Sequence, residues 1–349
     1  MAVLLAALVG LAWLAYVRTG ALRTVARGSR QHISRPVGDR RWVAWRQTDQ
    51  GRQAIMLLRG RGRPRELLAR ARLSEPAASG WRLFVGEADG ELLSVDARTG
   101  RVEAISRTRG ETDHMVVGDG HVWWLEHRAA ALPGVPFVSA GAPVSVIRTA
   151  PITGGEARVV AVTPRELGRV YERPGTGRPL ELVGAAEGRL YWLERRQAGR
   201  VLRTELRRGA PGRAPEILAV EPGAHTAALI DGTLAWTGPS DEAMIPTQYI
   251  AVRRMNLADG EVRTIADWLA RETILLGSDK RLYAQQQDLL WRLGQRRGQQ
   301  RIACRRTGPF QAAAVIGDRE YLVAGLENNW RIVERPLTWW ARVRRLVGR

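Results

Sequence analysis

Histidine is the residue type here that is best suited to moving protons or holding a metal ion, and the sequence contains five. His121 and His127 lie closest together, on either side of an apolar run that predicts a β-strand and ends in Glu126. Six residues of strand span ~20 Å, whereas the ligands of one zinc ion lie only ~2.1 Å from it. We therefore predict no metal site from these residues.

The remaining candidates for catalysis stand alone in the sequence. Asp113 and His114 resemble a carboxylate that orients a general base, but no nucleophile motif accompanies them. The single cysteine, Cys304, excludes a disulfide framework, and a lone cysteine on a strand is more often an inert small side chain than a nucleophile. Serine-hydrolase, phosphate-loop and zinc-hydrolase motifs are missing. The sequence therefore predicts no catalytic residue, no metal and no cofactor, and it favours a protein that is not an enzyme.

Arginine dominates the charge of the chain. There are 54 basic residues against 35 acidic ones, a net charge of +19, and Lys280 is the only lysine. Residues 1–74 hold 15 arginines against three acidic residues, whereas residues 75–330 are close to neutral. A phosphate-binding surface would normally mix lysine with arginine, because both neutralise phosphate. We therefore do not expect nucleic acid to be a partner.

Residues 2–17 form an uncharged, apolar segment. As a helix these 16 residues would rise ~24 Å, and residues 19–22 would extend them toward the ~30 Å of a hydrocarbon core. Arginines follow the segment instead of preceding it, which favours a retained anchor over a cleaved signal peptide. We predict one transmembrane helix over residues 1–22 and a basic juxtamembrane linker over residues 23–39.

The same arginines bear on location. The positive-inside rule places them, and the body that follows, on the cytoplasmic side of the cell membrane as a single-pass protein. A body on the exported side is the alternative. In both cases the lipid bilayer is a predicted partner.

A strand-rich unit recurs from residue 40 onward. Each copy has a turn rich in Gly or Asp and then a short apolar or aromatic strand, marked in the seven copies by Trp42, Leu83, Val122, Leu190, Leu234, Leu282 and Tyr321. The markers are 39 to 48 residues apart, with one gap of 68, and this period is typical of four-stranded propeller blades. We predict an all-β fold over residues 40–335, a β-propeller of seven blades, with six as the alternative. The recurring Trp42, Trp123, Trp192 and Trp236 should pack between blades.

Two parts of the repeat resemble known propellers. Residues 190–194, Leu-Tyr-Trp-Leu-Glu, with the strand at 201–206, resemble the Tyr-Trp-Thr-Asp repeat of lipoprotein-receptor-type and TolB-like propellers. Residues 96–100, Asp-Ala-Arg-Thr-Gly, are similar to quinoprotein-like propeller repeats. The first resemblance implies a propeller used for recognition. Neither assigns a catalytic residue.

The 68-residue gap indicates insertions between two blades. A helix is predicted to begin at Thr163 and Pro164 and to run to about Glu172, because threonine caps helices and proline suits their first position. Insertions of this kind map to loops on one rim of a propeller. The residues predicted to contact a protein partner there are Leu132, Val135, Phe137, Val138 and Tyr171.

Residues 336–349 predict a basic amphipathic tail. As a helix the segment would place tryptophan, valine and leucine on one side and arginine on the other, which suits the surface of an anionic bilayer. A ring-shaped fold would bring this tail beside the arginines that follow the anchor. The predicted membrane-contacting residues are Arg18, Arg23, Arg27, Arg30, Trp339, Trp340, Arg342 and Arg345.

These features predict a membrane-anchored β-propeller that acts as a binding or scaffolding module. The alternative is a propeller-type hydrolase or lyase with its site in the central funnel. An enzyme should gather several carboxylates and a histidine at one mouth of the channel, whereas a scaffold should show an apolar or mixed patch on one rim.

Overall fold

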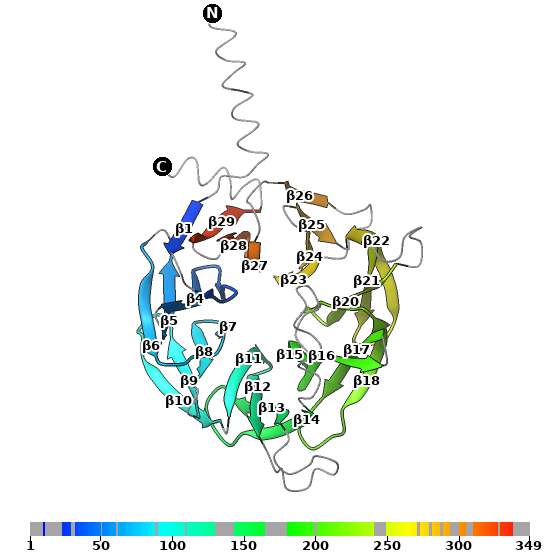
Figure 1. Ribbon diagram of the computed structural model, residues 1–349, viewed down its shortest axis with the longest axis horizontal. Helices are drawn as coiled ribbons and strands as arrows, with labels where there is room; N and C mark the ends of the chain where they lie inside the picture. The colour runs from blue at the N-terminus through cyan, green and yellow to red at the C-terminus, as the bar shows by residue number, and fades with distance from the viewer. Residues whose placement is uncertain are drawn as a thin grey trace, which may run out of the picture.

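The protein is built from β-strands in seven sheets around a central axis, as the computed structural model shows (Figure 1). The residues that it describes are 10, 23–28, 32–49, 51–60, 62–87, 90–108, 110–129, 143–164, 180–198, 201–240, 249–270, 273–278, 281–286, 289–293, 300–304, 310–326 and 329–337. Within those ranges no helix is long and apolar enough to cross a membrane. Apart from Gly10, the predicted anchor over residues 1–22 lies outside them.

Each sheet is one blade of antiparallel strands, and the first three blades follow one another along the chain. Blade 1 consists of β2 (His32–Ile33), β3 (Val37–Asp39), β4 (Trp42–Asp49), β5 (Arg52–Arg59) and β6 (Arg65–Arg70). Blade 2 consists of β7 (Ala77–Ser79), β8 (Arg82–Gly86), β9 (Glu91–Asp96) and β10 (Val102–Arg107). Blade 3 consists of β11 (Glu111–Gly118), β12 (His121–Ala129), β13 (Pro143–Pro151) and β14 (Arg158–Pro164).

Blades 4 to 6 repeat this arrangement. Blade 4 consists of β15 (Leu180–Ala186), β16 (Arg189–Ala198), β17 (Val201–Gly209) and β18 (Glu216–Pro222). Blade 5 consists of β19 (Ala227–Ile230), β20 (Thr233–Pro239), β21 (Tyr249–Asn256) and β22 (Val262–Ala270). Blade 6 consists of β23 (Ile274–Ser278), β24 (Arg281–Gln286), β25 (Leu289–Leu293) and β26 (Gln300–Cys304).

Blade 7 joins the two ends of the chain. It consists of β27 (Phe310–Ile316), β28 (Arg319–Leu326), β29 (Asn329–Pro336) and β1 (Arg23–Gly28). β1 is its outermost strand and pairs antiparallel with β29, from Arg23 opposite Glu334 to Gly28 opposite Trp330 (Figure 1). Residues 23–39, which the sequence indicated as a linker, therefore contain three strands and belong to the propeller.

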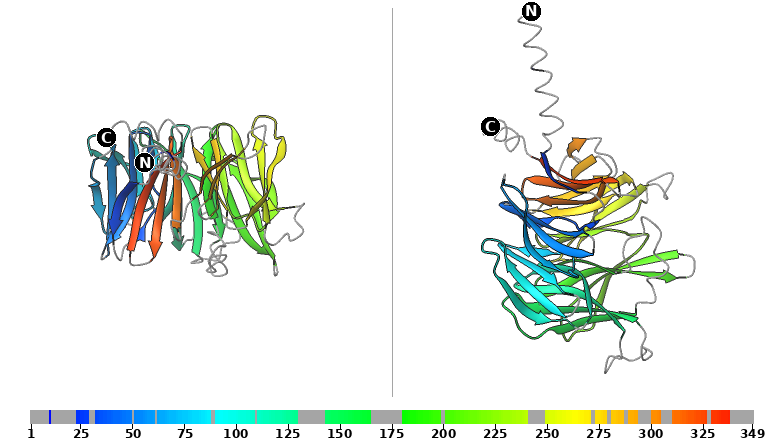
Figure 2. Two further views of the ribbon diagram at one scale, coloured as in Figure 1. Left: turned by 90° about the horizontal axis from the view of Figure 1, so that it is seen from above. Right: turned by 60° about the vertical axis from the view of Figure 1, so that its left-hand side comes forward.

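The innermost strands close into a ring. β3, β7, β11, β15, β19, β23 and β27 each contact the next, and β27 contacts β3. The strands run through the thickness of the disc, so the turns gather on its two faces (Figure 2, left). All seven sequence markers lie in the strand that pairs with the innermost strand of their blade, from Trp42 in β4 to Tyr321 in β28. The predicted all-β fold with seven blades is confirmed, and the six-bladed alternative is wrong.

The apolar core lies between neighbouring blades. Trp42 and Ile55 of blade 1 pack with Leu83 and Val95 of blade 2 in one cluster, and similar clusters join the blades that follow. Trp123 and Trp192 are only 1% and 0% exposed, as the prediction that they pack between blades requires. Burial of these side chains holds the blades together and keeps the inner strands in place.

The predicted helix does not begin at Thr163. Thr163 and Pro164 instead end strand β14, where Thr163 pairs with Ser145 and Pro164 with Val144. β14 is the outermost strand of its blade, and proline is tolerated there because an edge strand leaves amide positions unpaired. The rest of that predicted helix lies outside the described residues.

Candidate functional site

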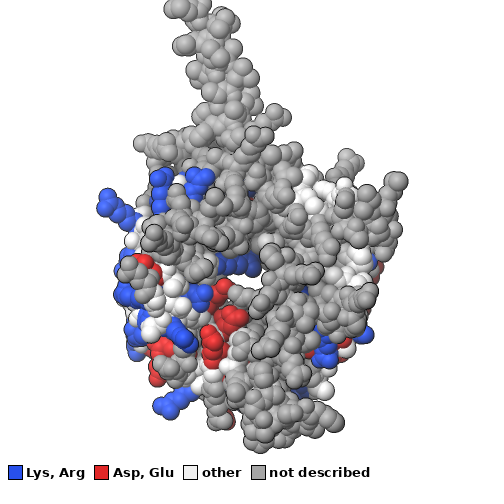
Figure 3. Space-filling view, viewed as in Figure 1, with Lys and Arg blue, Asp and Glu red and all other residues white. Residues whose placement is uncertain are grey.

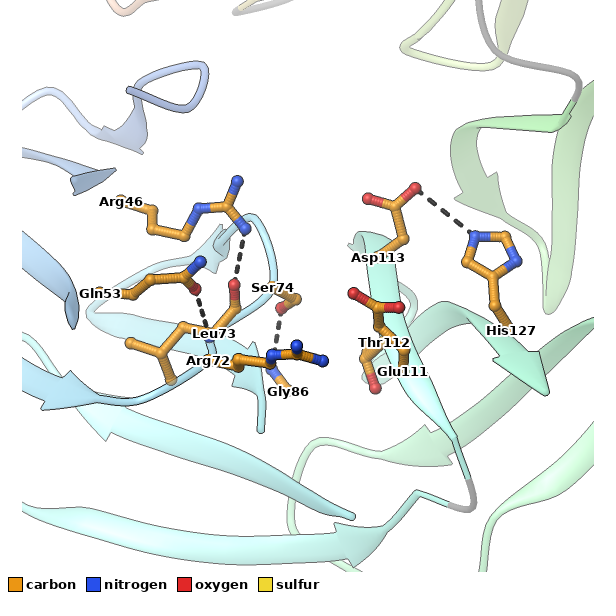
Figure 4. A pocket seen from close by; sticks show the side chains of 10 residues that line it. All are labelled: Arg46, Gln53, Arg72, Leu73, Ser74, Gly86, Glu111, Thr112, Asp113 and His127. Atoms are coloured by element: carbon orange, nitrogen blue, oxygen red, sulfur yellow. Dashed lines mark hydrogen bonds and ion pairs between the residues drawn. The ribbon is translucent and has the colours of Figure 1, made fainter. Parts of the chain in front are cut away.

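A cavity of about 400 Å³ lies beside the central channel, where blades 1, 2 and 3 meet (Figure 4). We call it the channel pocket. One wall carries Arg46 and Arg72, and the other carries Glu111, Asp113 and His127. Several carboxylates, a histidine and arginine thus share one mouth of the channel.

Blade 1 fixes the basic wall. Nη1 of Arg46 donates a hydrogen bond of 2.6 Å to the carbonyl oxygen of Leu73, and the amide of Leu73 donates one of 2.5 Å to Oε1 of Gln53. Both bonds hold the connection that leads from β6 into blade 2. The adjacent residue, Arg72, is exposed, and its guanidinium points across the pocket toward Glu111 (Figure 4). An arginine on an open wall is a binding group for a carboxylate or a phosphate.

A bulge in β11 builds the acidic wall. Glu111 pairs with His127 of β12, and the register then shifts within residues 112–115. A bulge changes the direction of a side chain, and here Asp113 lies beside the ring of His127, with 3.6 Å between Oδ2 and Nε2 (Figure 4). The other ring nitrogen, Nδ1, lies 3.0 Å from Oγ of Ser145. With a partner at each nitrogen, the imidazole is held in one orientation.

This arrangement can combine anion binding with proton transfer. A histidine oriented by polar neighbours is the commonest general base in enzymes. The side chains of His127 and Asp113 are 16% and 34% exposed, so both are accessible to a molecule in the pocket. Arg72 would bind the anionic part of the same molecule from the opposite wall.

Close packing of blade 2 against blade 3 shapes the pocket. The amide of Gly86 donates a hydrogen bond of 2.9 Å to Oγ of Ser74. An added Cβ at Gly86 would lie 2.6 Å from Cβ of Thr112, so only glycine fits without a shift of the neighbouring strand. The glycine therefore lets β8 approach the start of β11, where the acidic wall begins.

Further charged groups, some of them buried, lie beyond the pocket in blades 1 and 4, which surround the central channel together with the other blades. Arg35 lies between β2 and β3, where desolvation lowers the pKa of its guanidinium while the carboxylates of Glu181 and Glu75 raise it. Nη2 of Arg195 donates to Glu181 at 3.0 Å and to the carbonyl oxygen of His225 at 2.5 Å. Burial lowers the pKa of His225. Figure 3 shows acidic and basic groups close together around this opening.

The structure gives the sequence candidates different partners from those predicted. Asp113 lies beside His127, whereas Nδ1 of His114 accepts a hydrogen bond of 3.3 Å from the amide of Leu182 in blade 4. His121 and His127 lie toward opposite ends of β12, in agreement with the spacing argument. Among the residues that the structure describes, no group of three or more His, Cys, Asp or Glu is placed to hold a metal ion.

Most of the predicted contact residues cannot be placed. Arg23 and Arg27 lie in β1, and Cys304 ends β26. The others lie outside the described residues: Leu132, Val135, Phe137, Val138, Tyr171, Arg18, Arg30, Trp339, Trp340, Arg342 and Arg345.

Comparison with known proteins finds similar folds at low sequence identity. No protein-family model matches the chain, and no curated protein matches its sequence. An oligogalacturonate lyase in complex with manganese is 10% identical at a TM-score of 0.62, and the match covers 93% of this chain and 100% of that chain. An acylaminoacyl peptidase from Pyrococcus horikoshii is 12% identical at a TM-score of 0.62, over 88% of this chain and 52% of the peptidase. A prolyl endopeptidase is 14% identical at a TM-score of 0.53, and the match covers 90% of this chain and 51% of the endopeptidase.

These neighbours contradict the prediction of a non-catalytic binding or scaffolding module. They are structures of enzymes, and their likeness to this chain is one of fold. The chain spans the whole of the lyase but about half the length of the two peptidases. The described residues do not fit the manganese of the lyase, since they contain no suitable group of ligands.

Proposed function

We propose that this chain is a propeller-type lyase that binds a carboxylate-bearing sugar chain in the channel pocket and cleaves it by β-elimination. One observation carries the proposal: a single cavity of about 400 Å³ places arginine on one wall opposite an oriented imidazole on the other. The lyase that this chain covers in full supports an acidic oligosaccharide as the substrate class.

β-Elimination suits these side chains because it begins at a carbon next to a carboxylate. Arg72, with Arg46 beside it, binds the carboxylate and stabilises the negative charge that develops there when the neighbouring proton leaves. With its Nδ1 hydrogen donated to Oγ of Ser145, His127 accepts that proton at Nε2, and Asp113 at 3.6 Å then stabilises the charged imidazolium. The carbon–oxygen bond to the next sugar then breaks as a carbon–carbon double bond forms. The protonated imidazole returns its proton to the leaving oxygen.

The experiment measures unsaturated products from oligogalacturonate and related acidic oligosaccharides by the ultraviolet absorbance of the new double bond. We expect His127→Gln to lower kcat about 10²–10⁴-fold, the usual contribution of a general base, with little change in KM. Arg72→Gln removes a charge-assisted hydrogen bond to the substrate and the charge that stabilises the developing anion, so it should raise KM about tenfold or more and also lower kcat.

Arg213→Gln is the matched control, because Arg213 is an exposed arginine in the β17–β18 turn of blade 4. Its kcat and KM should equal those of the wild type. The proposal fails if the wild type releases no unsaturated product from any of these substrates, or if His127→Gln keeps the wild-type kcat.

We also propose that residues 1–22 anchor the propeller in a membrane, with the body on the cytoplasmic side. The uncharged run over residues 2–17 and the arginines that follow it support this topology. Membership of the lipoprotein-receptor-type or TolB-like propellers is a further proposal, supported by the resemblance of residues 190–206 to their repeat.

A further inference from the structure

Three guanidinium groups surround one indole on a turn that is far from the channel pocket. Trp81, between β7 and β8, lies 5.6 Å from Arg41, 5.7 Å from Arg59 and 5.2 Å from Arg98, measured from each guanidinium carbon to the ring centre. Trp42 stacks on the same ring at 6.4 Å. We call Arg41, Arg59, Trp81 and Arg98 the Trp81 cluster. Arg41 and Arg98 are exposed and Trp81 is half-buried, so the charges are open to solvent.

The Trp81 cluster and the channel pocket lie on opposite faces of the disc. Arg41 immediately precedes β4, which crosses the disc over eight residues, or ~26 Å, to Asp49. Arg46 of the pocket comes from the far half of that strand. The cluster therefore belongs to the face that carries the turns between the first and second strands of each blade.

The two ends of the propeller meet on the cluster's face. Arg23, the first residue of β1, donates to the carbonyl oxygens of Gly60 and Gly62 in the β5–β6 turn of blade 1. After β29, the amide of Leu337 donates a hydrogen bond of 2.7 Å to the carbonyl oxygen of Asp318 in the β27–β28 turn. Arg23 and Leu337 therefore both lie on this face, Arg23 beside blade 1 and Leu337 against blades 6 and 7.

Charge on this face is unevenly distributed. The described turns of blades 1 and 2 carry Arg40, Arg41, Arg59, Arg63, Arg98 and Arg101 against Asp39 and Asp96. Asp96 is engaged within its turn, where its carboxylate accepts the amide hydrogens of Thr99 and Arg98, and these bonds lower its pKa. The corresponding turns of blades 3, 4 and 5 carry Asp119, Glu187 and Asp231. The β17–β18 turn of blade 4 carries the exposed Arg213 as well, but among the described residues the larger share of arginine on this face lies in blades 1 and 2, the basic sector.

We propose that this basic sector docks on anionic phospholipid headgroups, with the channel pocket facing away from the bilayer. The indole holds the arginine side chains in position without neutralising them, so little conformational freedom is lost when they bind phosphate. Each arginine close to an anionic surface strengthens the attraction to it, and several on one plane act together. A bilayer is favoured over other polyanions because the uncharged residues 2–17 precede Arg23 in the sequence and the arginine-rich tail follows Leu337, and both of these residues lie on this face.

The test uses the full chain with Cys304→Ala and one new cysteine that carries a fluorophore. Thr99→Cys labels the exposed turn beside Arg98, and Asp49→Cys is the matched control on the other face. Each protein is mixed with vesicles of phosphatidylcholine alone or with phosphatidylglycerol, both containing a headgroup-bound quencher. We expect quenching at residue 99, but not at residue 49, to rise with phosphatidylglycerol. Arg41→Glu with Arg98→Glu should weaken association about tenfold or more.

Every other outcome overturns the proposal. Equal quenching at residues 99 and 49 would show that the cluster's face does not turn toward the bilayer. Quenching that is the same with and without phosphatidylglycerol would show that lipid charge is not involved. An unaffected double variant would exclude the Trp81 cluster as the contact. Duplex DNA that binds the cluster more tightly than anionic vesicles would assign the sector to nucleic acid. Circular dichroism of the double variant verifies that it is folded, and none of these variants touches the channel pocket.

Discussion

At Gly86 the channel pocket depends on the absence of a side chain. A Cβ at this position would lie 2.6 Å from Cβ of Thr112, closer than atoms pack in protein interiors. The residue has no positive φ, so an alanine would be strained by this contact alone. We expect Gly86→Ala to lower the free energy of unfolding by about 1–3 kcal/mol, measured by urea denaturation. With Thr112→Gly added, the total loss should be smaller than the sum of the two single losses, and additive losses would contradict the clash.

Tyr321 makes the free energy of unfolding depend on pH in the alkaline range. Burial, and to a smaller extent Glu334, raises the pKa of its phenol from 10.0 to about 12. Folding therefore favours the neutral phenol. Its contribution to the free energy of unfolding is complete below pH ~10 and is lost as the pH rises to ~12. A shift of this size corresponds to roughly 2–3 kcal/mol. Urea midpoints measured across this range should fall more steeply for the wild type than for Tyr321→Phe, and parallel curves would refute the assignment.

The sequence could not reveal the channel pocket at the level of residues. Arg46, Arg72 and His127 are separated by tens of residues, and they meet only because three blades meet. The sequence suggested Asp113 as the carboxylate that orients His114, but the bulge in β11 places it beside His127 instead. In a short strand a bulge does not visibly change the alternation of apolar and polar residues. The local sequence therefore does not indicate that Asp113 lies beside His127.

At the level of elements, β1 closes the ring. Its Val25 is 8% exposed and packs with Trp45 and Ile332, which joins the edge of blade 7 to blade 1. A chain that begins at residue 23 keeps this strand, whereas one that begins at residue 29 leaves β29 as a bare edge. We expect the shorter chain to melt at a lower temperature and to self-associate through that edge, measured by calorimetry and light scattering. Equal melting temperatures would show that β1 does not stabilise the ring.

The recurring strands were predictable, and the closing strand was not. Each marker residue, from Trp42 to Tyr321, combines an apolar side chain with a turn just before it, and this local pattern determines the second strand of a blade. β1 has the sequence Arg-Thr-Val-Ala-Arg-Gly, which resembles an ordinary basic linker. Only its pairing with β29, more than 300 residues away, makes it a strand.

The molecule as a whole has two unlike faces. One carries the channel pocket, and the other carries the Trp81 cluster and the two chain ends. Because the strands connect these faces through a rigid interblade core, contact on one face leaves the other open to solvent. Substrate could therefore reach the pocket while the opposite face is occupied.

The pairing of β1 with β29 also sets an order for biosynthesis. β29 leaves the ribosome about 300 residues after β1, so the two strands cannot meet until β29 has been synthesised. At ~5–20 residues per second, this interval lasts roughly 15–60 s for the ~300 residues between them. During that time blade 7 lacks the pairing of β1 with β29 that closes the ring.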